Sequence, residues 1–410
     1  MKNIYNSFII LLILVLSAQN SKAFDLNGNV LYQGDTNRPV NHVTVVLKNI
    51  GNNTYRTFVT SGNGFYQFPN VADGNYILSG TTSIPGGGVT YYDAVMVFMH
   101  LIGFYEFTPL EFLASDVNGS NTISWTDYNL IIKHLLFGTP FPVGPWRFET
   151  VAFTISNLKD GVPHGIGGTC SGDIGGTFVP TLYASPAIPV AQRGAVNVSG
   201  TESFTTSLIT QNEISITGTG LIIDYPSELL QIESIEFKGS GYECNIENGQ
   251  IRLVWGNPNT TPITFNEGEA FITINAKCTS EFKKGMTAGL SLNGNTSLMN
   301  SSNQEVTNLN FATPVIKFGN PSLTFTNYPN PFSNSSILSI NTPDEGNATI
   351  EIYNAAGQMV KNIQVGKLIS GYHEVTLDAS QMAQGSYICK LRIHSENNDL
   401  ENSIRILKIK

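Results

Sequence analysis

Residues 116–138 read DVNGSNTISWTDYNLIIKHLLFG and join a polar loop to an apolar, helix-forming segment. Oxygen-bearing residues recur in this loop at positions 1, 3, 5, 7, 9 and 12, the ligand spacing of twelve-residue calcium loops. The residues at these positions are Asp116, Asn118, Ser120, Thr122, Ser124 and Asp127. We therefore predict that Ca²⁺ binds here, with Thr122 contributing its main-chain carbonyl and Ser124 acting through a water molecule.

The residues around these ligands favour the same interpretation. A calcium loop turns sharply at position six, where Asn121 is one of the few residue types besides Gly that tolerate a left-handed backbone. Ile123 can anchor the loop to a core, and the helix that follows is expected to end at Gly138. The alternative is an Asn- and Ser-rich turn ahead of a helix, with no metal.

A second copy of the pattern lies upstream, at residues 89–103. Asp93 and His100 in this copy have the same spacing as Asp127 and His134. The loop before Asp93 carries Thr, Ile and Gly at the first three ligand positions, so we expect only one occupied calcium site. We expect both histidines to be packed against apolar neighbours rather than to bind metal.

The repeat pair at residues 82–148 resembles a pair of dockerin repeats, which have Asp rather than Glu at position 12. The resemblance implies a small helical module whose stability depends partly on calcium. It also implies a protein partner, because dockerins are bound by cohesin domains.

The composition indicates an extracellular chain of several β-rich domains. The 410 residues include 39 Gly, and only 13% are charged. The formal net charge is −9 and no basic run is present, which argues against binding to nucleic acid. Residues 1–23 have the basic start, short apolar core and small-residue cleavage site of a signal peptide, so the mature chain is expected to begin at Phe24.

Residues 24–81 alternate apolar and polar residues between turn signals such as Asn63-Gly64 and Asp73-Gly74, which predict hairpins. This segment resembles the carboxypeptidase-regulatory, transthyretin-like β-sandwich. The resemblance implies a structural or sugar-binding spacer without catalytic residues. Residues 149–186 are Gly-rich and irregular, and we predict a linker there.

Residues 187–318 contain strand-like segments separated by turn signals at the spacing of a β-sandwich. The segments 220–237, 251–258 and 268–278 resemble a cohesin-like domain, which implies a second sandwich. Because a cohesin is the receptor for a dockerin, the resemblance implies either a cohesin–dockerin-type partner or self-association. Self-association through two different surfaces would grow into chains unless it closed on itself.

Residues 319–410 contain several motifs in a fixed order. Residues 327–332 read NYPNPF, residues 348–360 read ATIEIYNAAGQMV, and residues 403–410 read SIRILKIK. These motifs resemble the C-terminal sorting domain of type IX secretion in Bacteroidetes. The resemblance implies a small β-sandwich that the outer-membrane translocon recognises and that is usually cleaved, with the protein secreted or held at the outer cell surface.

The sequence offers no recognisable active site. It contains no G-x-S-x-G, H-E-x-x-H or P-loop motif. Two acid pairs could mimic a glycosidase dyad, but we expect solvated strand residues there; these are Glu233 with Glu236, and Glu267 with Glu269. No C-x-x-C pair is present, and Cys244 and Cys278 form either a disulfide or a pair of free thiols.

We therefore expect a mainly β, multi-domain chain of sandwiches with one small α-helical calcium module. The predicted function is that of a secreted, non-catalytic adhesion or scaffold protein at the cell surface. One alternative is a polysaccharide-binding accessory protein of a glycan-degradation system. Its sugar platforms would be Tyr55, Phe65, Tyr66, Tyr91 and Tyr92, although we expect these aromatic residues to pack in the core instead. A second alternative is a hydrolase whose site the motifs do not reveal.

Overall fold

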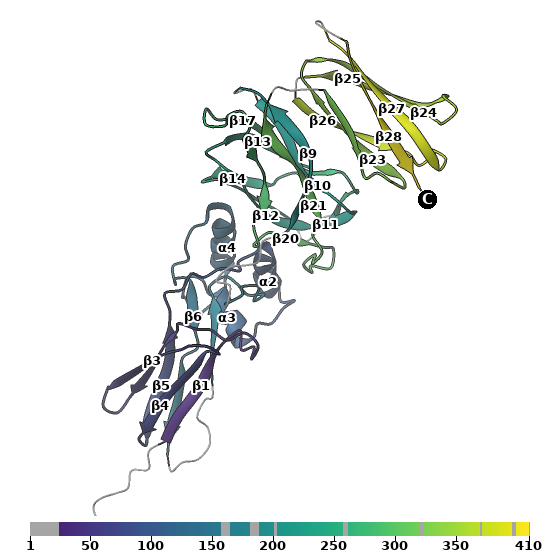
Figure 1. Ribbon diagram of the computed structural model, residues 1–410. Coiled ribbons are helices and arrows are strands. Elements are labelled where there is room, and N and C mark those ends of the chain that lie inside the picture. The colour runs from purple at the N-terminus through teal and green to yellow at the C-terminus, as the bar shows by residue number, and fades with distance from the viewer. Residues whose placement is uncertain are drawn as a thin grey trace, which may run out of the picture. The chain divides into compact units, whose positions relative to one another are not determined.

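The computed structural model is mostly β, with three short helices in its described part (Figure 1). It describes residues 24–156, 165–180, 188–200, 203–256, 261–319, 323–369, 371–395 and 399–409. The mainly β fold class predicted from the sequence is confirmed. The predicted signal peptide, residues 1–23, lies outside the described residues.

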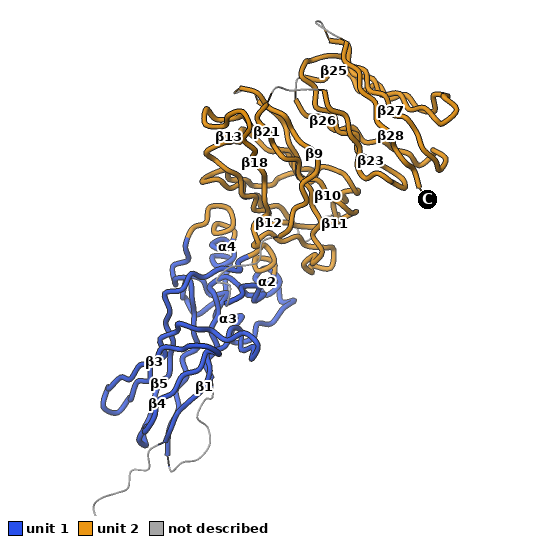
Figure 2. Tube along the Cα trace, in the orientation of Figure 1, with its two compact units in different colours: residues 1–89, 96–131, 140–185 blue, residues 90–95, 132–139, 186–410 orange. Residues whose placement is uncertain are grey.

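The chain forms two compact units (Figure 2). The first contains residues 1–89, 96–131 and 140–185, and the second contains residues 90–95, 132–139 and 186–410. The repeat pair is therefore divided between the two units, because residues 90–95 and 132–139 belong to the second unit and the rest of the pair belongs to the first.

The first unit contains a β-sandwich with sheet orders β4-β1-β8-β6 and β3-β2-β5-β7. Its strands are β1 (Phe24–Tyr32), β2 (Thr44–Asn49), β3 (Tyr55–Val59), β4 (Phe65–Val71), β5 (Gly74–Thr81), β6 (Trp146–Phe148), β7 (Val151–Ile155) and β8 (Gly165–Cys170). Alternate residues of β1, among them Leu26, Val30 and Tyr32, are fully buried, as expected for a strand with one face on a core. Trp146 joins this core, and its ring packs edge-on against Tyr32.

The prediction of a linker at residues 149–186 is wrong where the chain forms β7 and β8, because these two strands belong to the two sheets of the sandwich. The glycines that suggested a linker are needed in β8. A side-chain carbon at Gly167 would lie 2.7 Å from the Leu110 side chain, and one at Gly168 would lie 2.7 Å from the Phe148 ring. Glycine inside a strand marks such a close approach, and sequence periodicity alone does not reveal it.

The two predicted hairpins are also wrong. Asn63-Gly64 connects β3 to β4, and Asp73-Gly74 connects β4 to β5, but β4 lies in a different sheet from β3 and β5. These turns therefore carry the chain from one layer of the sandwich to the other.

Three helices lie between β5 and β6. They are α2 (Tyr91–Leu101), α3 (Pro109–Ser115) and α4 (Trp125–Phe137). Thr108 and Glu111 cap the start of α3 by a reciprocal pair of side-chain hydrogen bonds. As predicted, α4 ends before Gly138, whose φ of 63° lies in the left-handed region that favours glycine after a helix.

The second unit contains a central sandwich whose main sheets have the orders β13-β17-β10-β21-β18 and β14-β15-β12-β19. In addition, β9 pairs with β21, β20 pairs with β12, and β11 pairs with β16. Its strands are β9 (Val190–Val198), β10 (Ser203–Thr210), β11 (Ile214–Ile216), β12 (Gly218–Asp224), β13 (Leu230–Phe237), β14 (Glu243–Glu247), β15 (Gln250–Gly256), β16 (Ile263–Phe265), β17 (Ala270–Cys278), β18 (Thr287–Ala288), β19 (Ser291–Leu292), β20 (Ser297–Met299) and β21 (Phe311–Phe318).

The C-terminal part of the second unit is a smaller sandwich with sheet orders β22-β23-β26 and β25-β24-β27-β28. Its strands are β22 (Thr324–Tyr328), β23 (Ser335–Thr342), β24 (Gly346–Tyr353), β25 (Met359–Leu368), β26 (Gly371–Asp378), β27 (Gly385–His394) and β28 (Asp399–Lys408). The NYPNPF motif is tied to the last strand. The Asn330 side chain accepts a hydrogen bond from the Leu407 amide, and Phe332 is buried in the core.

Candidate metal centre

The predicted calcium loop connects the end of α3 to the start of α4. Asp116 is 1% exposed, and its two carboxylate oxygens accept hydrogen bonds from the amides of Ser120 at 2.9 Å and Asn121 at 3.0 Å. The Asn118 side-chain oxygen also accepts from the Ser120 amide, at 2.8 Å. These bonds curl the chain into a tight turn, because one side chain satisfies several backbone donors.

The backbone of this turn is left-handed at position six, where a calcium loop turns sharply. Asn121 has a φ of 59°, so the predicted left-handed residue at position six is confirmed. Gly119 has a φ of 76° and supplies a second left-handed residue two positions earlier.

Asp127 lies in the first turn of α4 and is fully buried. Its Oδ2 atom accepts hydrogen bonds from the amide and the hydroxyl of Ser124, both at 3.0 Å, and thereby caps the helix. Its Oδ1 atom is buried without a hydrogen-bond partner. A buried carboxylate oxygen without a partner is costly, and a cation in the loop would satisfy it.

The neutral oxygens of the loop lie beside these carboxylates in the sequence. The Ser120 hydroxyl donates to the Thr122 carbonyl at 3.0 Å, so two predicted ligands already contact each other. Among the described residues, no group of three or more His, Cys, Asp or Glu side chains gathers to hold a metal. An ion in this loop would thus be held by two carboxylates together with amide, hydroxyl and carbonyl oxygens, a donor set that suits Ca²⁺.

The first repeat shares the helix start but not the ligand set. The Asp93 Oδ2 atom accepts hydrogen bonds from the amide and hydroxyl of Thr90, at 2.6 Å and 2.9 Å. At the earlier ligand positions, the Thr82 hydroxyl donates to the His42 carbonyl, and Ile84 packs against the core of the first sandwich. Gly86, at the third position, brings no side-chain donor.

The two histidines have matching roles at the ends of their helices. Nδ1 of His100 lies 3.0 Å from the Tyr105 carbonyl, and Nδ1 of His134 lies 2.8 Å from the Thr139 carbonyl. Burial lowers the pKa of His134. Both rings therefore contact the chain that leaves the helix, and the His100 ring also stacks on Phe107.

A third aspartate loop, at residues 170–178, has a different character. Asp173 is fully buried, and its Oδ2 atom accepts hydrogen bonds from the Tyr32 hydroxyl and the Phe178 amide. Its Oδ1 atom accepts from the Thr177 amide at 2.7 Å. Burial raises the pKa of this carboxyl, although the hydrogen bonds oppose that shift. Because both oxygens have protein donors, this loop closes the first sandwich without needing an ion.

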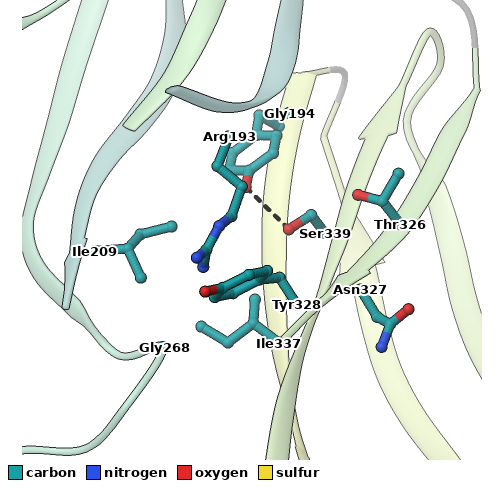
Figure 3. A pocket seen from close by; sticks show the side chains of 10 residues that line it. Arg193, Gly194, Ile209, Gly268, Thr326, Asn327, Tyr328, Ile337 and Ser339 are labelled. Carbon is teal, nitrogen blue, oxygen red and sulfur yellow. Dashed lines mark hydrogen bonds between the residues drawn. The ribbon is translucent and has the colours of Figure 1, made fainter. Parts of the chain in front are cut away.

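A pocket lies within the second unit, between the central sandwich and the C-terminal sandwich (Figure 3). The guanidinium of Arg193 lies over the ring of Tyr328, the tyrosine of the NYPNPF motif. Behind this pair, the Tyr372 hydroxyl bonds to the Ser339 hydroxyl and donates to Glu374. Burial raises the pKa of Glu374 to about 7. We interpret this group as a clamp between the two sandwiches.

One member of each acid pair considered as a catalytic candidate forms an ion pair with a lysine. Glu233 forms an ion pair with Lys277 at 3.1 Å, and Glu269 forms one with Lys238 at 2.7 Å. This arrangement agrees with the expectation of solvated strand residues. Cys244 and Cys278 are free thiols, the first exposed and the second buried.

The aromatic residues considered as sugar platforms differ in their exposure to solvent. Tyr55 and Phe65 are exposed, with 56% and 38% of their surface accessible. Tyr66 and Tyr91 are buried, as the favoured expectation of core packing predicted, and neither ring is available to a polysaccharide. Tyr92 is half-buried.

Comparison with known families identifies the C-terminal part of the chain. Residues 326–405 match the secretion system C-terminal sorting domain. The chain therefore carries a sorting domain of the type IX secretion system, as the sequence motifs predicted, and is a secreted or cell-surface protein. Residues 21–84 match the second β-sandwich domain of BOS complex subunit NOMO1-like proteins. A search of curated proteins gave no significant match.

Several solved structures show weak similarity. The sixth cohesin of scaffoldin B from Acetivibrio cellulolyticus, solved with a mutant Cel5 dockerin, is 16% identical over 32% of this chain and 100% of its own, with a TM-score of 0.26. The major pilin subunit BcpA of Bacillus cereus is 9% identical over 95% of this chain and 98% of its own, with a TM-score of 0.27. Dimeric latent PorU from Porphyromonas gingivalis is 14% identical over 44% of this chain and 20% of its own, with a TM-score of 0.20.

Within the described residues, none of the helices has the length and apolar character needed to span a bilayer. The dockerin resemblance of residues 82–148 stays a prediction.

Replacement of Asp173 by Asn should destabilise the first sandwich by about 1–3 kcal/mol, because an amide nitrogen would face backbone donors in place of one carboxylate oxygen. Hydrogen exchange of the β8 amides in the mature chain measures the loss. Asp25→Asn, at an exposed position of the same unit, should leave that exchange unchanged. Equal exchange in both variants would contradict a stabilising role for Asp173.

The clamp at Glu374 should make the second unit more stable as the pH is lowered from about 7.5 to about 5. The raised pKa means that the folded protein binds this proton more tightly than the unfolded chain, so its contribution to stability declines between pH 4.5 and about 7 as the pH rises.

Thermal unfolding across this pH range, compared between the wild type and Glu374→Gln, isolates this contribution. His134 acts in the opposite direction because its pKa is lowered, but it is present in both proteins. Parallel pH profiles for the two proteins would contradict the assignment.

Proposed function

We propose that this chain is a secreted, non-catalytic scaffold or adhesion protein whose helical module is stabilised by one calcium ion in the loop 116–127. The observation that carries the proposal is the buried Asp127 Oδ1 atom, which has no protein partner in a loop with calcium-ligand spacing. The sorting domain supports the extracellular setting, where calcium is available at the concentrations that weak extracellular sites require.

In this proposal the ligands are the carboxylates of Asp116 and Asp127, the side chains of Asn118 and Ser120, and the Thr122 carbonyl. Asp116 is the C-cap residue of α3, and Asp127 lies in the first turn of α4. An ion held by both would therefore fix the end of one helix to the start of the next. In a module with a small core of its own, such an ion contributes directly to folding.

The sorting domain would direct the chain to the type IX translocon through residues 319–410. Once outside the cell, the chain would present its β-sandwiches and its helical module. Two families predicted from sequence, the dockerin-like pair and the cohesin-like sandwich, support a protein partner of the cohesin–dockerin type. The polysaccharide-binding alternative retains Tyr55 and Phe65 as its exposed aromatic residues.

Calcium should raise the melting temperature of the mature chain, residues 24–410, above its value in excess chelator. A ligand at about 100 times its dissociation constant adds roughly 2.7 kcal/mol to the stability of the state that binds it. Asp127→Asn should abolish this rise, because it removes one carboxylate ligand and leaves the helix length unchanged.

Asp93→Asn is the matched control, because Asp93 caps the first repeat helix through the same two hydrogen bonds. This variant should be less stable but should keep its response to calcium. The proposal fails if calcium leaves the wild-type melting curve unchanged, or if Asp93→Asn loses the response as completely as Asp127→Asn does.

Export can be tested separately from metal binding. In a Bacteroidetes host with type IX secretion, a signal peptide and a fluorescent protein fused ahead of residues 319–410 should appear at the surface or in the medium. The chain truncated before residue 323 should remain inside the outer membrane. Surface delivery of the truncated chain would show that another segment directs export.

A further inference from the structure

The outer face of β12, β15 and β20 differs from an ordinary solvent-exposed sheet face. Leu221, Leu253 and Leu298 point into the core of the central sandwich. Their alternate neighbours point outward, and the cross-strand register places them together. These outward residues are Gly218, Gly220, Ile222, Arg252, Val254, Gly256, Ser297 and Met299. Three of them are glycines, so no side chain covers the backbone of the sheet at these positions.

Tyr91 fills the space over these glycines within the second unit. A side-chain carbon at Gly220 would lie 2.8 Å from the Tyr91 Cβ atom. Carbons at Gly218 and Gly256 would overlap the Tyr91 ring and hydroxyl. None of the three glycines has a left-handed φ, so backbone conformation does not explain them. Their common feature is the closeness of one aromatic side chain.

The same face completes the hydrogen bonding of two helix ends. Tyr91 is the first residue of α2, and its amide donates to the Ser297 hydroxyl at 2.9 Å. Leu135 lies in the last turn of α4, and its carbonyl accepts from the Arg252 guanidinium at 3.0 Å. Backbone groups at helix ends lack hydrogen-bond partners within the helix. A cationic side chain near a helix C-terminus is stabilising, because that end of the helix dipole is negative.

Burial agrees with a covered face. Ile222 and Met299 point away from the sandwich core, yet they are only 4% and 1% exposed. On the helix side, Tyr91, Ala94 and Leu135 are each less than a tenth exposed. An outward sheet face that faced water would leave residues of this size accessible.

We propose that the outer face of β12, β15 and β20 is a docking surface for the start of a helix whose first residue is aromatic. The chain occupies this surface with its own residues 90–95. The occupied surface is closed to other molecules. An external helical partner, or the helix of a second copy, has to displace Tyr91 before it can use the glycine-lined face. The proposal does not depend on calcium being bound in the loop 116–127.

A cross-linking experiment on the mature chain tests this proposal. Tyr91→Cys combined with Gly220→Cys places two thiols on carbons that lie 2.8 Å apart, and a shift of about 1 Å brings them to disulfide separation. A Cys244→Ser background removes the exposed native thiol. Under mild oxidation we expect an intramolecular cross-link at monomer mass, with a yield independent of protein concentration.

The matched control keeps Tyr91→Cys and moves the second thiol to Gly289→Cys. A side-chain carbon at Gly289 meets only Gln192, at 3.7 Å, so this pair should not cross-link. Three outcomes overturn the proposal: a concentration-dependent dimer, no cross-link in the Gly220 pair, or equal cross-linking in both pairs. A dimer would show that the face takes the helix of a second copy.

A second measurement applies if the double cysteine variant does not fold. Gly218→Ala should speed hydrogen exchange of β12 and of residues 91–95 by about tenfold or more, because the added methyl overpacks the Tyr91 ring. In a Tyr91→Ala background the same substitution should have no such effect. On an open strand, Ala in place of Gly is neutral or stabilising, so slower or unchanged exchange in Gly218→Ala alone would overturn the proposal.

Discussion

A carboxylate that leaves water needs hydrogen-bond donors or a cation, and this requirement shapes the loops at residues 90–93, 116–127 and 170–178. Asp93, Asp116, Asp127 and Asp173 are each no more than 1% exposed, in a protein with only 13% charged residues. Each carboxylate accepts hydrogen bonds from residues three to five positions away in its own loop, and thereby fixes a helix start or a turn. Among the four, Asp127 has an oxygen whose protein partner is missing. We therefore propose a cation in this loop, whereas in the Asp173 loop both carboxylate oxygens already have donors.

The sequence was sufficient where function or fold depends on local spacing. The left-handed Asn121, the end of α4 at Gly138 and the sorting-domain motifs each follow from a few neighbouring residues, and each prediction was confirmed. The segment 149–186 was misjudged because its glycines serve contacts with Leu110 and Phe148, which periodicity within the segment cannot indicate. The turn at Asn63-Gly64 was misjudged for a related reason. A turn signal marks a change of direction, but it does not reveal whether the next strand joins the same sheet.

The residues that bury Tyr91 could not be predicted, because they are glycines more than 120 residues later in the chain. The repeat pattern alone makes Tyr91 equivalent to Trp125, since both open a helix one residue after its capping hydroxyl residue. The structure separates them: Tyr91 is 4% exposed and Trp125 is 51% exposed. Sequence similarity between repeats therefore predicts equal local structure without predicting equal surroundings.

This difference offers a physical account of why the first repeat has a poorer ligand set than the second. A helix start needs partners for its free amides and a fixed direction for the entering chain. In the second repeat, Asp116 and Asn118 organise the entering loop, and we propose that calcium completes it. In the first repeat, the Ser297 hydroxyl accepts a hydrogen bond from the Tyr91 amide and the glycine-lined face holds the ring, so the start of α2 is fixed without a ligand set from positions 82, 84 and 86. The two repeats thus obtain the same helix start by different means, one through a loop suited to a metal ion and the other through a docked aromatic side chain.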